Sequence, residues 1–387
     1  MKKTILCMQT PNVDSPLLKQ PDFISEYDCV IQEITSKDKL LTCLKSLKEK
    51  NANIVAIYGG FGAFPMIGGL TPELINHPLF PSDTLRCIAL CSRGYNGYDL
   101  GALKEHNIAL YNYQDAQPDS LITQFQIDLV GNDVADCALW HVLEGFRKFS
   151  YQQTILRENG HTVKARSTMA NSPEADKFAF GHELSNKMLA ISPKGKKCLL
   201  LGLGSIGKQI AIKLQMGLGM EVHYAARHEA DVKDQGGFHW KFHNIQTLLS
   251  ENDDSELNQF NAVVVALPAT PQTYHLINSE FLQKCNKELV LVNVGRGDIV
   301  DMEAVTEAII NGQIRHIGTD VFHDEPKVDD ILRNDILQST VTPHVGSATS
   351  ELFSQSCEFA LTNIVRTTSN RYKDEPNHSD LKLCRVI

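Results

Sequence analysis

The chain has 387 residues, of which 42% are hydrophobic and 21% are charged, and its formal net charge is −9. This length fits two domains better than one, and the composition is that of an ordinary globular protein. The acidic balance argues against nucleic acid as a partner, and the absence of a polybasic patch or a long apolar run argues against a membrane.

The ten cysteines lie scattered, mostly within apolar segments. They show no CxxC motif and no His/Cys spacing of the kind that binds zinc, so we expect reduced thiols and no metal site. The apolar run at residues 4–8 is too short for a signal peptide and predicts a first strand. Together these features predict a cytoplasmic protein.

The first part of the chain alternates between strand-like and helical segments. Residues 4–8, 54–58 and 85–90 read as strands, and residues 38–50 read as a helix. Such alternation predicts a parallel sheet. The loop at residues 59–69 combines Gly60 with Phe61 and Phe64, which suits a substrate-facing lip, although a flexible connector has the same composition.

A helix is predicted at residues 132–149, where Asp133 and Asp136 would lie in the first turn and favour the N-terminus. The next segment, residues 157–188, is polar and reads as irregular. It is long enough to extend away from its own domain and pack on another part of the protein, for example on another subunit.

A glycine-rich turn then follows the apolar strand at residues 198–201. It carries Gly202, Gly204 and Gly207 at GxGxxG spacing, with Ser205 and Ile206 between them, and leads into a helical pattern. One glycine permits a tight turn, one lets the backbone approach a pyrophosphate, and one lets the helix pack on its strand. The strand before and the helix after the motif predict a dinucleotide site.

Five further strands are predicted at residues 221–224, 262–267, 289–293, 316–320 and 340–342. With the glycine turn they form a complete doubly wound unit. A last helix, near residues 351–369, leads into a polar tail.

Three of these strands are followed by residues that carry chemistry. Arg296, Glu325 and His344 come after successive strands, and ligands of open α/β sheets bind beyond the carboxyl ends of strands. Arg296 would bind a carboxylate and polarise the adjacent ketone. His344 would protonate the developing alkoxide as hydride arrives, and Glu325 would orient the imidazole and favour its proton-donating form.

The motifs VNVGRGDIVD, TDVFHDEP and TPHVGSAT, together with GLGSIG, resemble the D-isomer-specific 2-hydroxyacid dehydrogenases. The resemblance implies that Arg296, Glu325 and His344 are catalytic, and that Arg93 and Gly94 hold the substrate carboxylate. It implies an α/β fold with two doubly wound, Rossmann-like domains, in which a cofactor domain (131–350) is inserted into a substrate domain (1–130 and 351–387). The family is usually dimeric, so a homodimer is expected, with residues 157–188 in the contact.

The cofactor prediction depends on a departure from the family pattern. NAD-dependent members commonly have an aspartate at the end of the second strand, where this chain has Ala226 followed by Arg227 and His228. Losing a carboxylate removes its repulsion of a 2′-phosphate, which favours NADP over NAD. The predicted cofactor set is Gly202, Gly204, Ser205, Ile206, Gly207, Arg227, His228, Leu267, Pro268, Thr273, Val294, Asp320 and Gly346, and the predicted substrate set is Gly60, Phe61, Arg93 and Gly94.

Other local features, GHELSNK and KLQMGLGM, resemble the fungal D-mandelate dehydrogenase branch. They favour a pocket for a branched or aromatic 2-oxo acid, which Phe61, Phe64 and Met66 would line. A glyoxylate or hydroxypyruvate reductase is the alternative within the enzymes. An NAD(P)-binding corepressor, which would keep the same three residues, is the alternative from another class.

Overall fold

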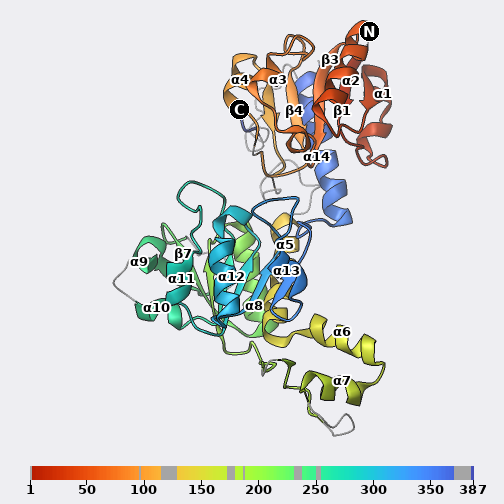
Figure 1. Ribbon diagram of the computed structural model, residues 1–387. Coiled ribbons are helices and arrows are strands. Elements are labelled where there is room, and N and C mark those ends of the chain that lie inside the picture. The colour runs from red at the N-terminus through yellow and green to blue at the C-terminus, as the bar shows by residue number, and fades with distance from the viewer. Residues whose placement is uncertain are drawn as a thin grey trace. The chain divides into compact units, whose positions relative to one another are not determined.

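The computed structural model describes residues 2–95, 97–114, 129–171, 179–185, 188–230, 238–249, 254–369 and 385–387. The chain divides into two compact units, one of Met1–Leu129 with Thr349–Ile387 and the other of Val130–Ala348. Each unit has its own parallel sheet with helices packed against it (Figure 1). The two-sheet α/β fold predicted from the sequence is confirmed.

The first unit contains a five-stranded sheet in the order β2-β1-β3-β4-β5, with every pair parallel. Its strands are β1 (Lys3–Cys7), β2 (Tyr27–Ile31), β3 (Ile54–Gly60), β4 (Cys87–Leu90) and β5 (Ala109–Tyr111). β3 and β4 are fully buried and read as apolar runs, as central parallel strands do. The edge strands β2 and β5 were not predicted, because β2 contains Asp28 and is partly exposed, and β5 has only three residues.

The helices of this unit are α1 (Pro21–Glu26), α2 (Lys37–Glu49), α3 (Pro72–Ile75), α4 (Leu100–Glu105) and α14 (Ser350–Thr368), with the single turns η1 (Leu17–Lys19) and η2 (Pro65–Ile67). Ser36 caps α2 by accepting a hydrogen bond from the Lys39 amide. α2 buries Leu40, Leu44 and Leu47, which share one helix face. α14 packs on β3 and β4, so the end of the chain completes a core begun by its start.

The second unit contains a seven-stranded parallel sheet in the order β12-β11-β10-β9-β6-β7-β8. Its strands are β6 (Lys197–Leu201), β7 (Glu221–Ala226), β8 (Lys241–Asn244), β9 (Ala262–Val265), β10 (Leu289–Asn293), β11 (Ile314–Thr319) and β12 (Ser339–Val341). The strand order reverses between β6 and β9, which is the switch point where doubly wound folds bind ligands.

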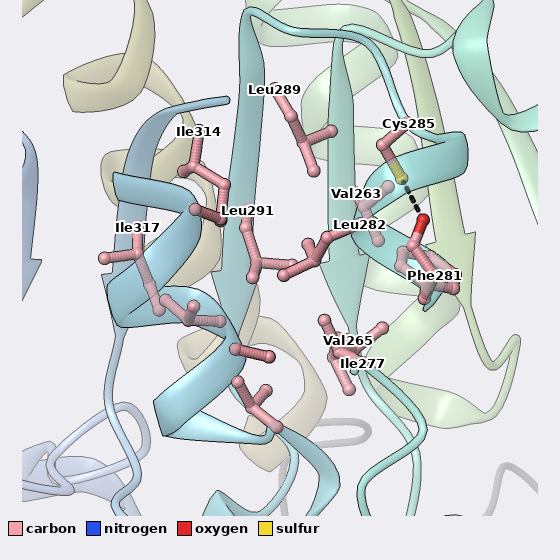
Figure 2. Packing of buried hydrophobic residues seen from close by; sticks show 14 of the residues in the cluster. Val263, Val265, Ile277, Phe281, Leu282, Cys285, Leu289, Leu291, Ile314 and Ile317 are labelled. Carbon is pink, nitrogen blue, oxygen red and sulfur yellow. Dashed lines mark hydrogen bonds between the residues drawn. The ribbon is translucent and has the colours of Figure 1, made fainter. Parts of the chain in front are cut away.

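The helices of this unit are α5 (Leu129–Arg147), α6 (Phe149–Asn159), α7 (Thr162–Met169), α8 (Ser205–Leu218), α9 (Ile245–Leu249), α10 (Asp254–Asn258), α11 (Ser279–Lys284), α12 (Met302–Ile310) and α13 (Asp330–Asn334), with the single turn η4 (Gly297–Ile299). Side chains of β9, β10 and β11 form one core with α11 and α12 (Figure 2). Within it, the Cys285 thiol donates to the Phe281 carbonyl at 3.2 Å. No helix in the described ranges is long and apolar enough to cross a membrane.

Two sequence predictions in this unit are wrong. α5 begins at Leu129 rather than at residue 132, so Asp133 and Asp136 do not lie in its first turn. Residues 157–169 are not irregular, since they complete α6 and form α7. α6 buries no side chain, and a helix that faces solvent can be polar on most sides without losing its hydrogen bonds.

Candidate active site

The turn between β6 and α8 carries the three glycines of the dinucleotide motif. Gly202 has a φ of +98°, and a Cβ on Gly207 would lie 2.2 Å from the Gly202 carbonyl oxygen. Only glycine therefore lets α8 start this close to β6. The space beside Gly204 is open, and Gly204 caps α8 without a side chain. The start of α8, with Ser205 and Ile206, fits an anion such as a pyrophosphate.

The end of β7 carries the residues predicted to select the cofactor. Ala226 is half-buried, whereas Arg227 and His228 are exposed. Asn244, which pairs with Ala226 from β8, donates its side-chain amide to the Arg227 carbonyl at 3.3 Å. This strand end therefore has a cation, an imidazole and an amide, and its first carboxylate among the described residues that follow β7 is the exposed Glu229, three positions after Ala226.

The loop after β9 and the loop after β10 contact each other. Thr273 closes the first loop, because its hydroxyl donates to the Pro268 carbonyl at 2.8 Å and accepts from the Thr270 amide at 2.8 Å. A Cβ on Gly295 would lie 2.7 Å from the Leu267 carbonyl oxygen, so the two loops are in close contact. Val294 continues β10 by donating its amide to the Val265 carbonyl at 3.1 Å.

Arg296 lies in a turn that a strand-end asparagine holds. Asn293 is buried, accepts from the Gly295 amide at 3.0 Å and donates to the Arg296 carbonyl at 2.9 Å. The half-buried guanidinium donates to the Gly295 carbonyl at 2.7 Å. A Cβ on Gly297 would lie 2.0 Å from the Phe322 carbonyl carbon, so this turn packs directly on the turn that follows β11.

That second turn holds Glu325, which pairs with His344. The Nδ1 atom of His344 lies 3.1 Å from Oε1 and 3.0 Å from Oε2 of Glu325. Glu325 is oriented in turn by the Phe322 amide, which donates to Oε1 at 3.0 Å. The side chains of His344 and Glu325 are 50% and 39% exposed. Because a carboxylate only accepts, Nδ1 carries a proton, and Nε2 is the ring nitrogen that this pair leaves available.

The turn that carries His344 is built on Asp320. This buried carboxylate accepts from the Val345 amide at 2.9 Å, the Gly346 amide at 2.7 Å and the Thr342 hydroxyl at 2.6 Å. His344 itself has a φ of +56°, a backbone conformation that residues other than glycine rarely adopt. Asp320 and Gly346, both predicted as cofactor residues, are thus hydrogen-bonded to each other, and Asp320 holds the backbone that follows His344.

The predicted substrate residues belong to the first unit. Gly60, at the end of β3, has a φ of +62°, and Phe61 donates its amide to the Gln9 side chain at 2.8 Å. Phe61 is 42% exposed. Arg93 and Gly94 follow β4 and are half-buried, and the Arg93 carbonyl accepts from Asn112 at 2.6 Å.

One aromatic residue predicted to line the substrate pocket does not. Phe64 is fully buried in the core of the first unit and contacts the ring of Tyr98 edge-on at 5.4 Å. Met66 is 56% exposed, so it stays open to a ligand. A loop phenylalanine next to glycines has the same sequence pattern whether it packs inward or outward, so the pattern does not distinguish Phe64 from Phe61.

The described residues contain no group of three or more His, Cys, Asp or Glu side chains that could hold a metal ion. The supporting residue that sequence reasoning missed is Asn293. A signal for it exists, since an asparagine that ends an apolar strand just before GRG is placed to accept from the backbone two residues on.

Known proteins resemble this chain in sequence. The family profile described as "D-isomer specific 2-hydroxyacid dehydrogenase, NAD binding domain" matches residues 163–346. A Saccharomyces cerevisiae protein that is named, provisionally, as a 2-hydroxyacid dehydrogenase is 50% identical over 378 residues, which cover 98% of this chain and 97% of the relative. Glyoxylate/hydroxypyruvate reductase B of Pectobacterium atrosepticum is 34% identical over 291 residues, or 75% of this chain and 78% of the relative.

Solved structures share the fold. The holo form of Rhodotorula graminis D-mandelate dehydrogenase has a TM-score of 0.74 at 24% identity, and the match covers 95% of this chain and 94% of that one. An NADPH-dependent glyoxylate/hydroxypyruvate reductase from Sinorhizobium meliloti has a TM-score of 0.67 at 24% identity and covers 95% and 96% of the two chains.

Proposed function

Since this chain belongs to the D-isomer-specific 2-hydroxyacid dehydrogenases, a family of NAD(P)-dependent oxidoreductases, we propose that it reduces a 2-oxo acid to the D-2-hydroxy acid with NADPH. The observation that carries the proposal is the hydrogen-bonded pair of Glu325 and His344 beside the Arg296 turn. The unit Val130–Ala348 binds the cofactor in this proposal, and the unit formed by the two chain ends binds the acid.

In the proposed reaction the reduced nicotinamide supplies the hydride. Arg296 binds the substrate carboxylate and polarises the neighbouring ketone, which lowers the cost of the developing negative charge. His344 donates the Nε2 proton to the ketone oxygen as that oxygen gains negative charge. Glu325 holds the orientation of the imidazole through its hydrogen bond with Nδ1. The backbone of Arg93 and Gly94 holds the carboxylate from the substrate unit.

The preference for NADPH is supported by the end of β7. The exposed Arg227 and His228 offer positive and hydrogen-bonding groups to a 2′-phosphate, and Ala226 offers no carboxylate to repel it. Asn244 fixes the backbone of this turn through the Arg227 carbonyl. The structurally similar Sinorhizobium meliloti reductase is NADPH-dependent by name, which is consistent with this assignment.

The substrate class we propose is a branched or aromatic 2-oxo acid, because Phe61 and Met66 expose apolar surface on the loop after β3. Small acids form the second candidate, since relatives at 30% and 34% identity are named glyoxylate/hydroxypyruvate reductases. The names of the relatives favour an enzyme over the corepressor alternative.

The test is NADPH and NADH oxidation by the purified protein with glyoxylate, hydroxypyruvate, 2-oxoisocaproate, phenylpyruvate and benzoylformate, followed by chiral analysis of the product. Turnover of the three bulky acids with NADPH, giving the D-product, is expected. Turnover of glyoxylate or hydroxypyruvate alone would keep the mechanism and change the substrate class. If the protein binds the cofactor tightly but oxidises neither NADPH nor NADH with any of these acids, the corepressor alternative is favoured.

We also propose that the protein is a cytoplasmic homodimer in which α6 and α7 form part of the contact. These two helices pack on each other and extend from the sheet of their unit (Figure 1). They and the segment after them expose Phe149, Leu156 and Phe180, which are 43%, 41% and 78% exposed. Light scattering of the purified protein should give twice the mass of one chain, and Leu156→Asp should reduce that mass to one chain.

A further inference from the structure

A chain of buried polar side chains, ending in the half-buried Thr342 and in Asp320, runs behind the His344 turn, and of its members only Thr342 and Asp320 have been described above. It comprises Lys148, His316, Thr340, His141, Thr342 and Asp320. These residues come from α5 and the turn after it, and from β11 and β12 and the residues that directly follow these strands. His141 and His316 are 0% exposed, and Lys148 is 1% exposed. Such groups are costly to bury unless every one is hydrogen-bonded.

Chemistry fixes the direction of the chain from its Asp320 end. At the Lys148 end, the side-chain nitrogen lies 2.7 Å from Nδ1 of His316 and can donate whether it is charged or neutral, and burial lowers the pKa of Lys148 well below its usual value. At the other end, the Asp320 carboxylate only accepts, so the Thr342 hydroxyl must donate to it across 2.6 Å.

The links between these ends then have one consistent assignment. Nε2 of His316 donates to the Thr340 hydroxyl at 3.0 Å, and Thr340 donates its proton to Nδ1 of His141 at 2.8 Å. Nε2 of His141 donates to Thr342 at 3.2 Å. Both histidines are then neutral with the proton on Nε2, which agrees with burial: it lowers the pKa of His141 to about 3 and the pKa of His316 well below its usual value.

The backbone makes room for both rings. A Cβ on Gly318 would lie 2.6 Å from the Cβ of His141. A Cβ on Gly145 would lie 2.3 Å from Val290 and 3.2 Å from the His316 ring. The helix α5 and the strand β11 therefore approach each other through glycines, and the two imidazoles are built into the contact between them.

We propose that this chain positions the proton donor, with His141 as the positioning residue that orients Thr342 and Asp320 beneath the His344 turn. Asp320 holds the two amides that follow His344, and His344 has a backbone conformation that must be held in place. The role as positioning residue rests on the proposed function of His344, whereas the tautomers do not. An error in placing the acid group is expensive, since about 1 Å can cost on the order of a hundredfold in rate.

The experiment compares two amides at position 141. In His141→Gln the amide replaces Nε2 and can still donate to Thr342, whereas in His141→Asn it replaces Nδ1 and cannot reach Thr342. Both variants keep a neutral primary amide at position 141 and differ in which ring nitrogen that amide replaces. We expect His141→Asn to lower kcat by roughly tenfold or more, with an unchanged Kd for NADPH, and His141→Gln to stay within about twofold of the wild type. Equal kcat values for the two folded variants would overturn the proposal.

A second measurement does not depend on activity or on the stability of a variant. Histidine ¹⁵N resonances of the wild-type protein should show His141 and His316 neutral and protonated on Nε2 at neutral pH. A proton on Nδ1 of His141, or a charged His141 ring, would overturn the assignment. If the wild type reduces no 2-oxo acid, the proposed function fails, and the amide shifts of Val345 and Gly346 in His141→Asn still report whether position 141 sets this turn.

Discussion

The second unit contains the same chemical pair, a histidine on a glutamate, in two different settings. At the carboxyl edge, His344 meets Glu325 at 3.0 Å, with side chains that are 50% and 39% exposed. Between β7, β8 and α10, His243 meets Glu256 at 2.7 Å, and the His243 side chain is only 3% exposed. The two contacts have similar geometry, so distance alone does not say which pair reacts.

The second ring nitrogen makes the difference. Nε2 of the buried His243 contacts Nδ1 of His223 at 2.9 Å, and His223 in turn contacts Glu221 at 2.7 Å. Both nitrogens of His243 are therefore committed to the protein, which makes the pair structural. At the carboxyl edge of the sheet, Nδ1 of His344 is hydrogen-bonded to Glu325, and Nε2 is available to bind a ligand. Edge residues should thus control ligands and rate, whereas interior residues should control stability.

The largest effect is expected from His344→Gln. Without an acid the alkoxide must form unprotonated, so kcat should fall by about 10²–10⁴-fold while the Kd for NADPH stays the same. His243→Gln is the matched control, and it should retain kcat while lowering the free energy of unfolding. Steady-state kinetics and cofactor titration of both variants test this, and normal turnover by His344→Gln would refute the acid role.

The next effect concerns pH and the buried His141. Its pKa is about 3 in the folded protein against an ordinary value of 6.5, so between these values the unfolded chain binds one more proton. The free energy of unfolding should therefore fall as the pH falls below 6.5, by about 1.4 kcal/mol per pH unit from this residue. Urea unfolding at pH 4.5–6.5 measures the slope. His141→Gln should reduce the slope by that amount, and equal slopes would contradict the prediction.

A smaller effect comes from one substitution made at both pairs. Glu256→Gln replaces a charged hydrogen bond to a buried ring by a neutral one and should lower the free energy of unfolding by about 1–2 kcal/mol, with kcat unchanged. Glu325→Gln, on exposed groups, should leave stability within about 0.5 kcal/mol and lower kcat instead. Denaturant unfolding and kinetics on the same preparations would separate the two roles. A stability loss confined to Glu325→Gln would reverse the comparison.

The sequence predicts where the strands of the second unit end much better than it predicts which buried side chains contact each other. β6 and β10 are unbroken apolar runs followed by glycine-bearing turns, so their ends and the residues after them can be located by inspection. The interior depends on tertiary contacts. His141 and Thr340 are 199 residues apart in sequence and 2.8 Å apart in the fold, and no local pattern joins them.

The start of α5 shows a second kind of limit. Asp133 and Asp136 favour a start at residue 132, yet α5 runs from Leu129 and includes Gly131, a residue type with low helix propensity. A Cβ on Gly131 would lie 3.2 Å from the Ser205 carbonyl oxygen. The glycine is there because α5 passes close to the nucleotide turn, and a reason of that kind becomes visible only once both elements are placed.

The last effect we predict concerns cofactor choice, at the carboxyl edge of the sheet. Ala226→Asp would place a carboxylate at the end of β7, where it can accept hydrogen bonds from ribose hydroxyls and repel a 2′-phosphate. The ratio of kcat/KM for NADPH to that for NADH should fall by about tenfold, equivalent to ~1.4 kcal/mol. Because Ala226 is half-buried at a strand end, the free energy of unfolding of Ala226→Asp should differ little from that of the wild type. Arg227→Ala should also lower the ratio, because it removes a positive charge that would bind the 2′-phosphate. An unchanged ratio in both variants would mean that discrimination lies elsewhere on this edge.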